Sequence, residues 1–475
     1  MDRKNRSKKM KIRQLTTALT ACFLGLSACF ISTPTPVKAE AYWPSMPNIE
    51  AESAIVMEIN TGTVLYEKNS RDTHYPASIT KILTTLLAIE NSSLDETVVF
   101  SYDAVFGGNE GDTSHIARDW KEELTMEQVL YAVMLESANE CAYAAAEHVG
   151  ESKGGDYQTF IDMMNERVRE LGCVNTQFKN CNGLPDPEHY TCAYDMALIG
   201  AECYKNETFR TIAGATSYKI PETNKHDEPY YCHNHHKMIY PWRGDDDHLY
   251  DYCTGGKTGY TDAAKNTLVT FAEKDGMSLV CVVMYAKAPT QYTTTRTLFD
   301  YCFDNFQALS IAENETSISD DGLKNAGVLN GNPAFISLDK EAYIILPKTV
   351  EFSDATFTFQ TNVEDTIARL VYNYAGKEVG QADIITANVT AEPTPFERER
   401  IVEPEKKVVQ IKPIMIFAVV FMIVAIAASI YFGKRLFDNF YVIRHKLLAK
   451  KEQKDRFREI KKRKMRRKRR RNRLF

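Results

Sequence analysis

A run of 21 residues without any charge, PIMIFAVVFMIVAIAASIYFG at 413–433, constrains this 475-residue chain more than any other feature. A helix rises about 1.5 Å per residue, so the run is long enough to cross the roughly 30 Å hydrocarbon core of a bilayer. A buried helix of a soluble domain is the alternative, but only a basic tail follows the run. We therefore predict one transmembrane helix at 413–433.

The charges on the two sides of this run differ in sign. Residues 434–475 contain 20 Lys/Arg and 4 Asp/Glu, a net charge of +16, and residues 1–41 carry 8 basic and 2 acidic groups, a net of +6. The whole chain has a formal charge of -5, which leaves -27 for residues 42–433. Basic flanks stay in the cytoplasm. We therefore expect a protein of the cell membrane with a cytoplasmic tail and an extracytoplasmic ectodomain.

The basic tail also has the composition of a nucleic-acid-binding segment, because clustered Lys and Arg neutralise phosphates. Its end, KKRKMRRKRRRNRLF, offers only Phe475 for base stacking, and no base-reading fold accompanies it. A topology determinant that can also lie on anionic lipid head groups explains the tail better. We expect no nucleic-acid partner.

The amino-terminal segment, residues 1–41, has the features of a secretory signal peptide. A basic start is followed by an apolar stretch to Ile31 and by small residues at Ala39 and Ala41. The tetrapeptide LSAC, which ends at Cys29, resembles a lipobox, so lipidation of this cysteine stays open as the rival interpretation.

Eleven cysteines are present, of which two lie in the signal region and nine in the ectodomain. Disulfides are permitted outside the cell, but an odd number of cysteines cannot all pair internally. Local bridges between Cys181 and Cys192, or between Cys232 and Cys253, would suit the short separations. The sequence leaves the connectivity open.

Two β-hairpins with helices between them organise the ectodomain. Alternation and turn residues predict hairpins at 51–70, around Asn60-Thr61-Gly62, and at 263–286, around Lys274-Asp275-Gly276. Helical periodicity predicts helices at 79–89, 125–135, 142–149 and 160–171. Strands from both ends of this region can join one sheet, which predicts an α/β domain.

A different pattern follows this α/β domain. Short strand-like runs such as AYIILP, TFTFQ and ARLVYNY predict a small all-β domain, and a Pro- and charge-rich linker leads to the membrane. The predicted organisation is a signal peptide (1–41), a catalytic domain (42–310), a β-rich domain (311–392), a linker (393–412), the transmembrane helix (413–433) and the basic tail (434–475).

Ser78 and Lys81 form an S-x-x-K pattern at the start of the first predicted helix, so both side chains share one face. A lysine amine can take the proton of a serine hydroxyl if burial or a nearby cation lowers its pKa. Alone, this short pattern is more often a capping serine and a surface lysine. Two further patterns favour a catalytic role over this ordinary interpretation.

The first is Ser137-Ala138-Asn139, in the turn between two predicted helices, where a hydroxyl and an amide can face a cleft. The second is Lys257-Thr258-Gly259 in TGGKTGYT, just before the second hairpin, where glycine lets a substrate approach a strand edge. Helix capping and turn geometry explain each pattern taken alone. The three patterns together, in this order, indicate a catalytic site.

The sequence resembles the serine penicillin-binding enzymes, and in particular the low-molecular-mass D-alanyl-D-alanine carboxypeptidases, whose superfamily carries S-x-x-K, S-x-N and K-T-G motifs. The segments that carry the resemblance are PASITKILT, LESANECAYAAAEHVG, NGLPDPEHYTCAYDMALI and GGKTGYTDAAKNTLV. The likeness covers residues 50–305 and continues more weakly to about 390. It implies a β-lactamase/transpeptidase-like fold, with an antiparallel sheet and a helical cluster.

The resemblance also implies roles for individual residues. Ser78 would be the nucleophile and Lys81 its base, while Ser137 would relay a proton to the leaving amine. Asn139 would hold the substrate amide, and a permanently charged Lys257, together with Thr258 beside Gly259, would bind the terminal carboxylate. Backbone N–H groups of Ser78 and Tyr260 would form the oxyanion hole.

The implied reaction is removal of the last D-alanine from peptidoglycan stem peptides, with β-lactams as covalent inhibitors and without a cofactor. Three alternatives remain open: a β-lactamase, an endopeptidase or transpeptidase that uses the same site, and a β-lactam-sensing receptor. The E-x-x-L-N pattern of glutamate-dependent β-lactamases is missing, and the tail contains no folded cytoplasmic module that a receptor would need.

The run Cys232-His233-Asn234-His235-His236 contains ligand types that bind zinc. Its spacing matches no standard zinc pattern, and the resembling enzymes need no metal. We therefore predict no metal site.

Overall fold

The computed structural model describes residues 42–107, 113–241, 244, 246–315, 336–360 and 368–386, which all lie within one compact unit, residues 1–389. The predicted signal peptide, linker, transmembrane helix and basic tail fall outside the described residues. No helix among the described residues is long and apolar enough to cross a membrane.

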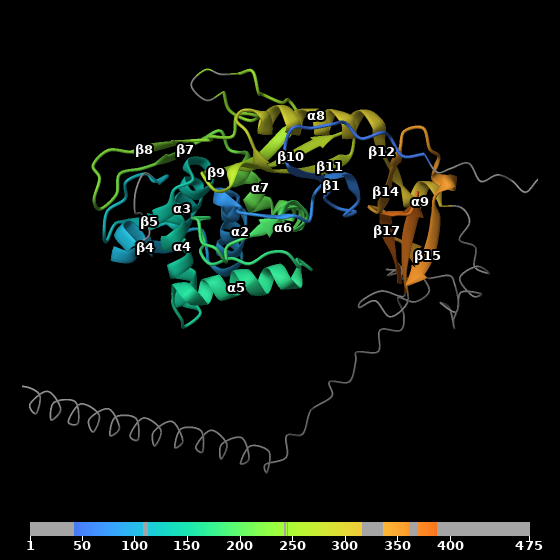
Figure 1. The fold of residues 1–475 in the computed structure, drawn as a ribbon. Helices are drawn as coiled ribbons and strands as arrows, with labels where there is room; N and C mark the ends of the chain where they lie inside the picture. The colour runs from blue at the N-terminus through green and yellow to red at the C-terminus, as the bar shows by residue number, and fades with distance from the viewer. Residues whose placement is uncertain are drawn as a thin grey trace, which may run out of the picture. The chain divides into compact units, whose positions relative to one another are not determined.

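A five-stranded antiparallel sheet forms the centre of the unit, in the order β2-β1-β11-β10-β9 (Figure 1). Its strands are β1 (Ser53–Glu58), β2 (Val64–Lys68), β9 (Cys253–Thr261), β10 (Lys265–Lys274) and β11 (Met277–Ala286). The first hairpin joins the last through β1 and β11, which pair from Ser53↔Met284 to Glu58↔Leu279. The prediction that strands from both ends of the region share one sheet is therefore confirmed.

The β10–β11 hairpin shows why its turn was predictable. Lys274 pairs with Met277, so the loop consists of Asp275 and Gly276, which both have positive φ angles of 52° and 79°. A two-residue loop of this kind has the twist that antiparallel strands need, and Asp-Gly is a favoured sequence for it.

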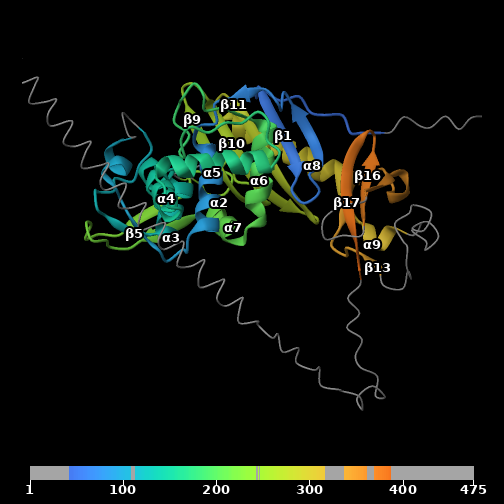
Figure 2. The same ribbon diagram turned by 90° about the horizontal axis from the view of Figure 1, so that it is seen from below.

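Both faces of the sheet are covered by helices. Along β1, Ile55 and Met57 belong to one apolar core, and the alternating Ala54 and Val56 belong to a second. The first core joins the sheet to the helical cluster, whereas the second packs the sheet against a single long helix, α8 (Thr290–Asn305). Figure 2, seen from below, has α5 and α6 in front of the strands. Burial on both faces explains the uninterrupted apolar run VCVVM in β11.

The helical cluster comes from the segment between the two hairpins. Its helices are α2 (Lys81–Asn91), α3 (Met126–Tyr131), α4 (Asn139–Ser152), α5 (Tyr157–Glu170), α6 (Ala193–Lys205) and α7 (Glu207–Gly214). The four helices predicted in this segment are confirmed, although the one expected at 125–135 is α3 followed by a π-helical turn, Ala132–Glu136.

Short strand pairs and turns connect these helices. The pairs are β3 (Thr73–His74) with β6 (Thr191–Cys192), β4 (Thr97–Val99) with β5 (Glu123–Thr125), and β7 (Ser217–Ile220) with β8 (Tyr230–His233). A π-helical turn, Asp103–Gly107, follows β4.

After α8 the chain forms mainly strands. β12 (Phe306–Ser310) pairs with β14 (Tyr343–Pro347), and a four-stranded sheet has the order β13-β17-β16-β15. The strands of that sheet are β13 (Ile336–Leu338), β15 (Thr356–Gln360), β16 (Ala368–Tyr374) and β17 (Lys377–Thr386), with short helical turns at α9 (Ile311–Asn314) and Phe352–Asp354.

Candidate active site

Ser78 lies in a short 3-10 turn, Ala77–Thr80, immediately before α2. The turn is held in an unusual shape, because Ala77 has a φ of 52° and the hydroxyl of Thr267 donates a 2.8 Å hydrogen bond to the Pro76 carbonyl. Gly183 packs so closely that an added Cβ would lie 1.9 Å from the Ala77 oxygen. Contacts from two distant segments thus fix the backbone that presents Ser78.

Lys81 lies directly behind Ser78 and is fully buried. Its Nζ is 3.0 Å from Ser78 Oγ, 2.7 Å from Asn139 Oδ1 and 2.6 Å from the carbonyl oxygen of Asn182. Burial, reinforced by the nearby charge of Lys257, lowers the pKa of Lys81 well below its usual value.

The three partners of Lys81 fit a neutral amine. Two of them, the Asn139 and Asn182 oxygens, can only accept, and they use the two N–H groups of an uncharged amine. The third partner, the Ser78 hydroxyl, can donate its proton to the remaining lone pair. This geometry gives the Ser78 hydroxyl a nearby acceptor for its proton, as a serine nucleophile requires.

The S-x-N segment lies where the π-helical turn gives way to α4, which confirms its prediction between two helices. Ser137 adopts a left-handed conformation, with φ of 60° and ψ of 27°. Its buried Oγ has no hydrogen-bond partner among the described residues. Asn139 is the first residue of α4, and its backbone N–H donates to the carbonyl of Ser114. The Ser137 hydroxyl is therefore unpaired, the backbone of Asn139 is held in place, and both residues line the cleft.

The K-T-G segment belongs to β9, the strand at the end of the sheet. Gly259 is opposite Thr267 in β10 and touches the Ser78 turn. An added Cβ at Gly259 would lie 2.9 Å from the Ser78 nitrogen and 2.3 Å from Thr267 Oγ1. Only glycine lets this strand lie so close to the serine.

Lys257 lies within the same strand and is buried, with Nζ donating a 3.0 Å hydrogen bond to the Thr258 carbonyl. Burial lowers the pKa of Lys257 to about 7, and the Glu136 carboxylate opposes this shift. The sequence interpretation of a permanently charged Lys257 thus meets an opposing effect, because desolvation disfavours the ammonium.

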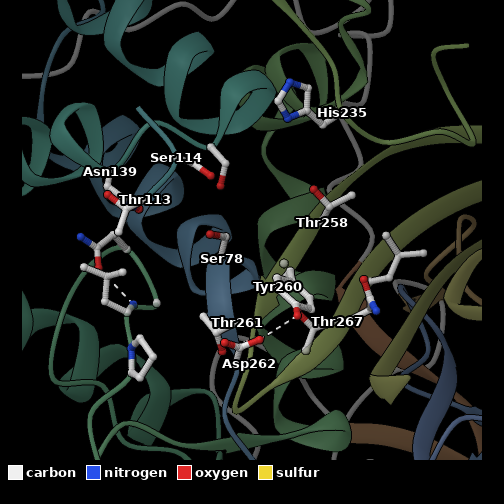
Figure 3. A pocket seen from close by; sticks show the side chains of 18 of the residues that line it. Ser78, Thr113, Ser114, Asn139, His235, Thr258, Tyr260, Thr261, Asp262 and Thr267 are labelled. Carbon is white, nitrogen blue, oxygen red and sulfur yellow. Dashed lines mark hydrogen bonds between the residues drawn. The ribbon is translucent and has the colours of Figure 1, made fainter. Parts of the chain in front are cut away.

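These segments surround a cleft of about 470 Å³. Figure 3 shows Ser78 at its centre, with Asn139 and Thr113 on one side and Thr258 and Tyr260 on the other. Six of the eight predicted site residues line it, namely Ser78, Ser137, Asn139, Thr258, Gly259 and Tyr260. The other two are the buried lysines, Lys81 and Lys257, which do not line the cleft.

Sequence reasoning assigned no role to several residues that shape this site. They are Thr113, Ser114, Glu136, Asn182, Gly183 and His235. The Asn-Gly pair at 182–183 is a recognisable turn signal, but its contact with Lys81 spans 101 positions and leaves no local trace. His235 belongs to the run considered above for zinc, and the other residues carry no pattern that sequence alone could have singled out.

The suggested local disulfides are absent, because all nine cysteines from Cys141 to Cys302 are unpaired in the structure. Cys181 contacts the hydroxyl of Tyr157, and Cys192 caps α6 through a hydrogen bond from the Asp195 N–H. Among the described residues, no group of three or more His, Cys, Asp or Glu side chains could hold a metal ion.

A model of the D-alanyl-D-alanine carboxypeptidase family matches residues 40–288. The D-alanyl-D-alanine carboxypeptidase DacF of Bacillus subtilis (strain 168) is 32% identical over 307 residues, which are 64% of this chain and 74% of that protein. DacA of Haemophilus influenzae is 27% identical over 80% of this chain and 94% of its own length.

Solved structures agree with the sequence matches. Penicillin-binding protein 5 from Haemophilus influenzae has a TM-score of 0.57 at 24% identity, over 73% of this chain and 98% of its own, which shows the shared fold. The Streptomyces K15 DD-transpeptidase has a TM-score of 0.51 at 26% identity, over 55% of this chain and all of its own. The predicted α/β transpeptidase-like fold is confirmed, and the protein belongs to the D-alanyl-D-alanine carboxypeptidase family.

Proposed function

We propose that this enzyme removes the C-terminal D-alanine from peptidoglycan stem pentapeptides through an acyl-enzyme on Ser78. The observation that carries this proposal is the 3.0 Å contact between Ser78 Oγ and Nζ of the buried Lys81. A lysine with a lowered pKa can accept the serine proton near neutral pH.

In the acylation step, Ser78 Oγ attacks the carbonyl carbon of the last peptide bond while its proton passes to Lys81. The oxyanion is held by the backbone N–H groups of Ser78 and Tyr260. The bond to the terminal amine then breaks, and the amine takes a proton that Ser137 relays. A water molecule hydrolyses the ester, which releases the shortened peptide and restores Ser78.

Substrate recognition uses the remaining residues of the cleft. The amide of Asn139 holds the substrate backbone with its Nδ2, because its Oδ1 already accepts from Lys81. The Lys257 ammonium and the Thr258 hydroxyl bind the free terminal carboxylate, and the carboxylate in turn favours the protonated lysine. This requirement selects a terminal residue rather than an internal bond. β-Lactams would acylate the same serine.

The cellular setting of the proposal comes from the sequence. A cleavable signal peptide, a single membrane-spanning segment at 413–433 and a basic tail would place the catalytic domain, 42–310, and the β-rich domain, 311–392, outside the membrane. Peptidoglycan lies on that side.

Mass spectrometry of the purified protein tests the proposed reaction. We expect benzylpenicillin to leave a stable adduct on Ser78, and a peptide that ends in D-Ala-D-Ala to lose one alanine. Ser78→Ala should show neither change. A short-lived adduct with an intact peptide would indicate a β-lactamase instead, and a stable adduct without peptide turnover would indicate a receptor.

A further inference from the structure

Glu136 lies beside the cleft, at the end of the π-helical turn and immediately before Ser137. One carboxylate oxygen, Oε1, accepts a 2.7 Å hydrogen bond from the backbone N–H of His233, the last residue of β8. The other, Oε2, is 3.0 Å from Nε2 of His235. The carboxylate of Glu136 therefore contacts both the end of β8 and the segment that follows it.

His235 in turn lines the cleft. Figure 3 shows its ring on the same side as Thr258, across the cleft from Asn139. The 3.0 Å distance from Glu136 Oε2 to His235 Nε2 keeps the ring next to the carboxylate. The side chain of Glu136 is only 12% exposed, so little solvent competes for these contacts.

We propose that Glu136 is a positioning residue for substrate recognition, which fixes His235 at the wall of the cleft and supplies the negative charge that lets the buried Lys257 bind a carboxylate. The inference rests on the proposed role of Lys257 in binding the terminal carboxylate. Glu136 touches no reacting atom, so its removal weakens substrate binding more than bond cleavage.

The charges around Lys257 support this assignment. Burial lowers the pKa of Lys257, and Glu136 is the charge that raises it again. Burial, and after it the charge of Lys257, lower the pKa of Lys81. His236 stays uncharged, because burial lowers its pKa to about 3.

Two other titratable groups near Glu136 have raised pKa values. Burial raises the pKa of Tyr230 and of Cys232 to about 12 in each case. Arg118 lies over the Tyr230 ring and is paired with Glu122 at 2.9 Å. Lys257, in contrast, has a pKa of about 7.

Steady-state kinetics of the full-length protein test the proposal with a peptide that ends in D-Ala-D-Ala. Glu136→Gln keeps the shape of the side chain and removes its charge, so we expect KM to rise about tenfold with kcat within about twofold of the parent. The rise of KM with increasing pH should begin at a lower pH in Glu136→Gln, because Lys257 loses its proton sooner. Glu136→Asp, which restores the charge, should recover part of the loss.

Glu127→Gln is the matched control, because Glu127 accepts a hydrogen bond from Tyr218 of β7 and so joins the same strand pair without lining the cleft. We expect it to leave KM unchanged. An unchanged or lower KM in Glu136→Gln, or a fall in kcat alone, would overturn the proposal. If Glu136→Gln does not fold, His235→Gln tests the same proposal. An unchanged KM in His235→Gln would contradict the positioning role of Glu136.

A failure of this proposal can be distinguished from a failure of the proposed serine mechanism. Acylation of each variant by saturating benzylpenicillin reports whether Ser78 is competent. A parent protein that fails to acylate refutes the serine mechanism, whereas acylation in every variant with no change in KM refutes only the role of Glu136.

Discussion

At the residue scale, Lys81 combines burial with two obligatory acceptors, so its neutral form fits the site better than its charged form. Arginine cannot be deprotonated in proteins, and its planar group does not fit the three partners. We expect Lys81→Arg to slow acylation by benzylpenicillin by about 10³-fold or more. Lys179→Arg, at an exposed pair with Glu188, is the control. Acylation of Lys81→Arg at the parental rate would refute the base assignment.

Lys257 leads to a prediction about stability, because its pKa is about 7 in the folded protein and 10.5 for an ordinary lysine. Between these values the unfolded chain binds more protons than the folded protein, so the free energy of unfolding rises with pH across this window. Below pH 7 the folded protein carries the buried charge at full cost.

Lys257→Met removes this cost, since methionine fills similar space without a charge. We expect the variant to be more stable than the parent at pH 6 by roughly 1–3 kcal/mol, with the difference shrinking toward pH 10, and to lose carboxypeptidase activity. Thermal unfolding at several pH values measures the effect. A Tm below that of the parent at pH 6 would contradict the argument.

At the element scale, the approach of β9 to the Ser78 turn sets the geometry of the site. Gly259→Ala places a Cβ against the Ser78 nitrogen and Thr267 Oγ1, so the strand or the turn must move. A displacement of this kind moves the nucleophile away from its alignment, so we expect acylation to slow by about 10²-fold. Stopped-flow acylation, with circular dichroism to check the fold, would show this. A parental rate would mean that the contact is not tight in solution.

The elements also show what a sequence can and cannot predict. The Asp275-Gly276 hairpin and the turn that carries Ser137 were predictable, because turn chemistry and periodicity are local. The positive φ of Ala77 was not, since the backbone packed against Ala77, at Gly183, lies more than 100 positions away in the sequence. The hydrogen bond from His233 to Glu136 spans 97 positions and likewise exists only once the fold has formed. The motifs therefore identified the candidate reacting groups, while the groups that position them came from the structure.

At the scale of the whole molecule, the strands after α8 complete the core of the central sheet. Phe306 of β12 is fully buried and lies 5.0 Å from the Trp43 ring, measured between ring centroids. Ile345 of β14 belongs to the same apolar core as the buried residues of α8. The hydroxyl of Tyr343 donates a 2.7 Å hydrogen bond to Oε1 of the buried Glu58, whose Oε2 accepts from the backbone of the first hairpin turn.

A protein cut at residue 310, the predicted end of the catalytic domain, would keep β12 but lose its partner β14. It would also expose part of the α8 core and leave Glu58 without the Tyr343 hydroxyl. These losses amount to a few kcal/mol, so we expect the fragment 42–310 to melt roughly 5–15 °C below the fragment 42–389. Because every residue that lines the cleft precedes position 293, penicillin acylation below the melting temperature should persist in both. Differential scanning calorimetry of the two fragments measures the difference between their melting temperatures.

Equal melting temperatures would mean that the catalytic region is stable without β14. The contacts at Ile345 and Tyr343 would then add little to its stability.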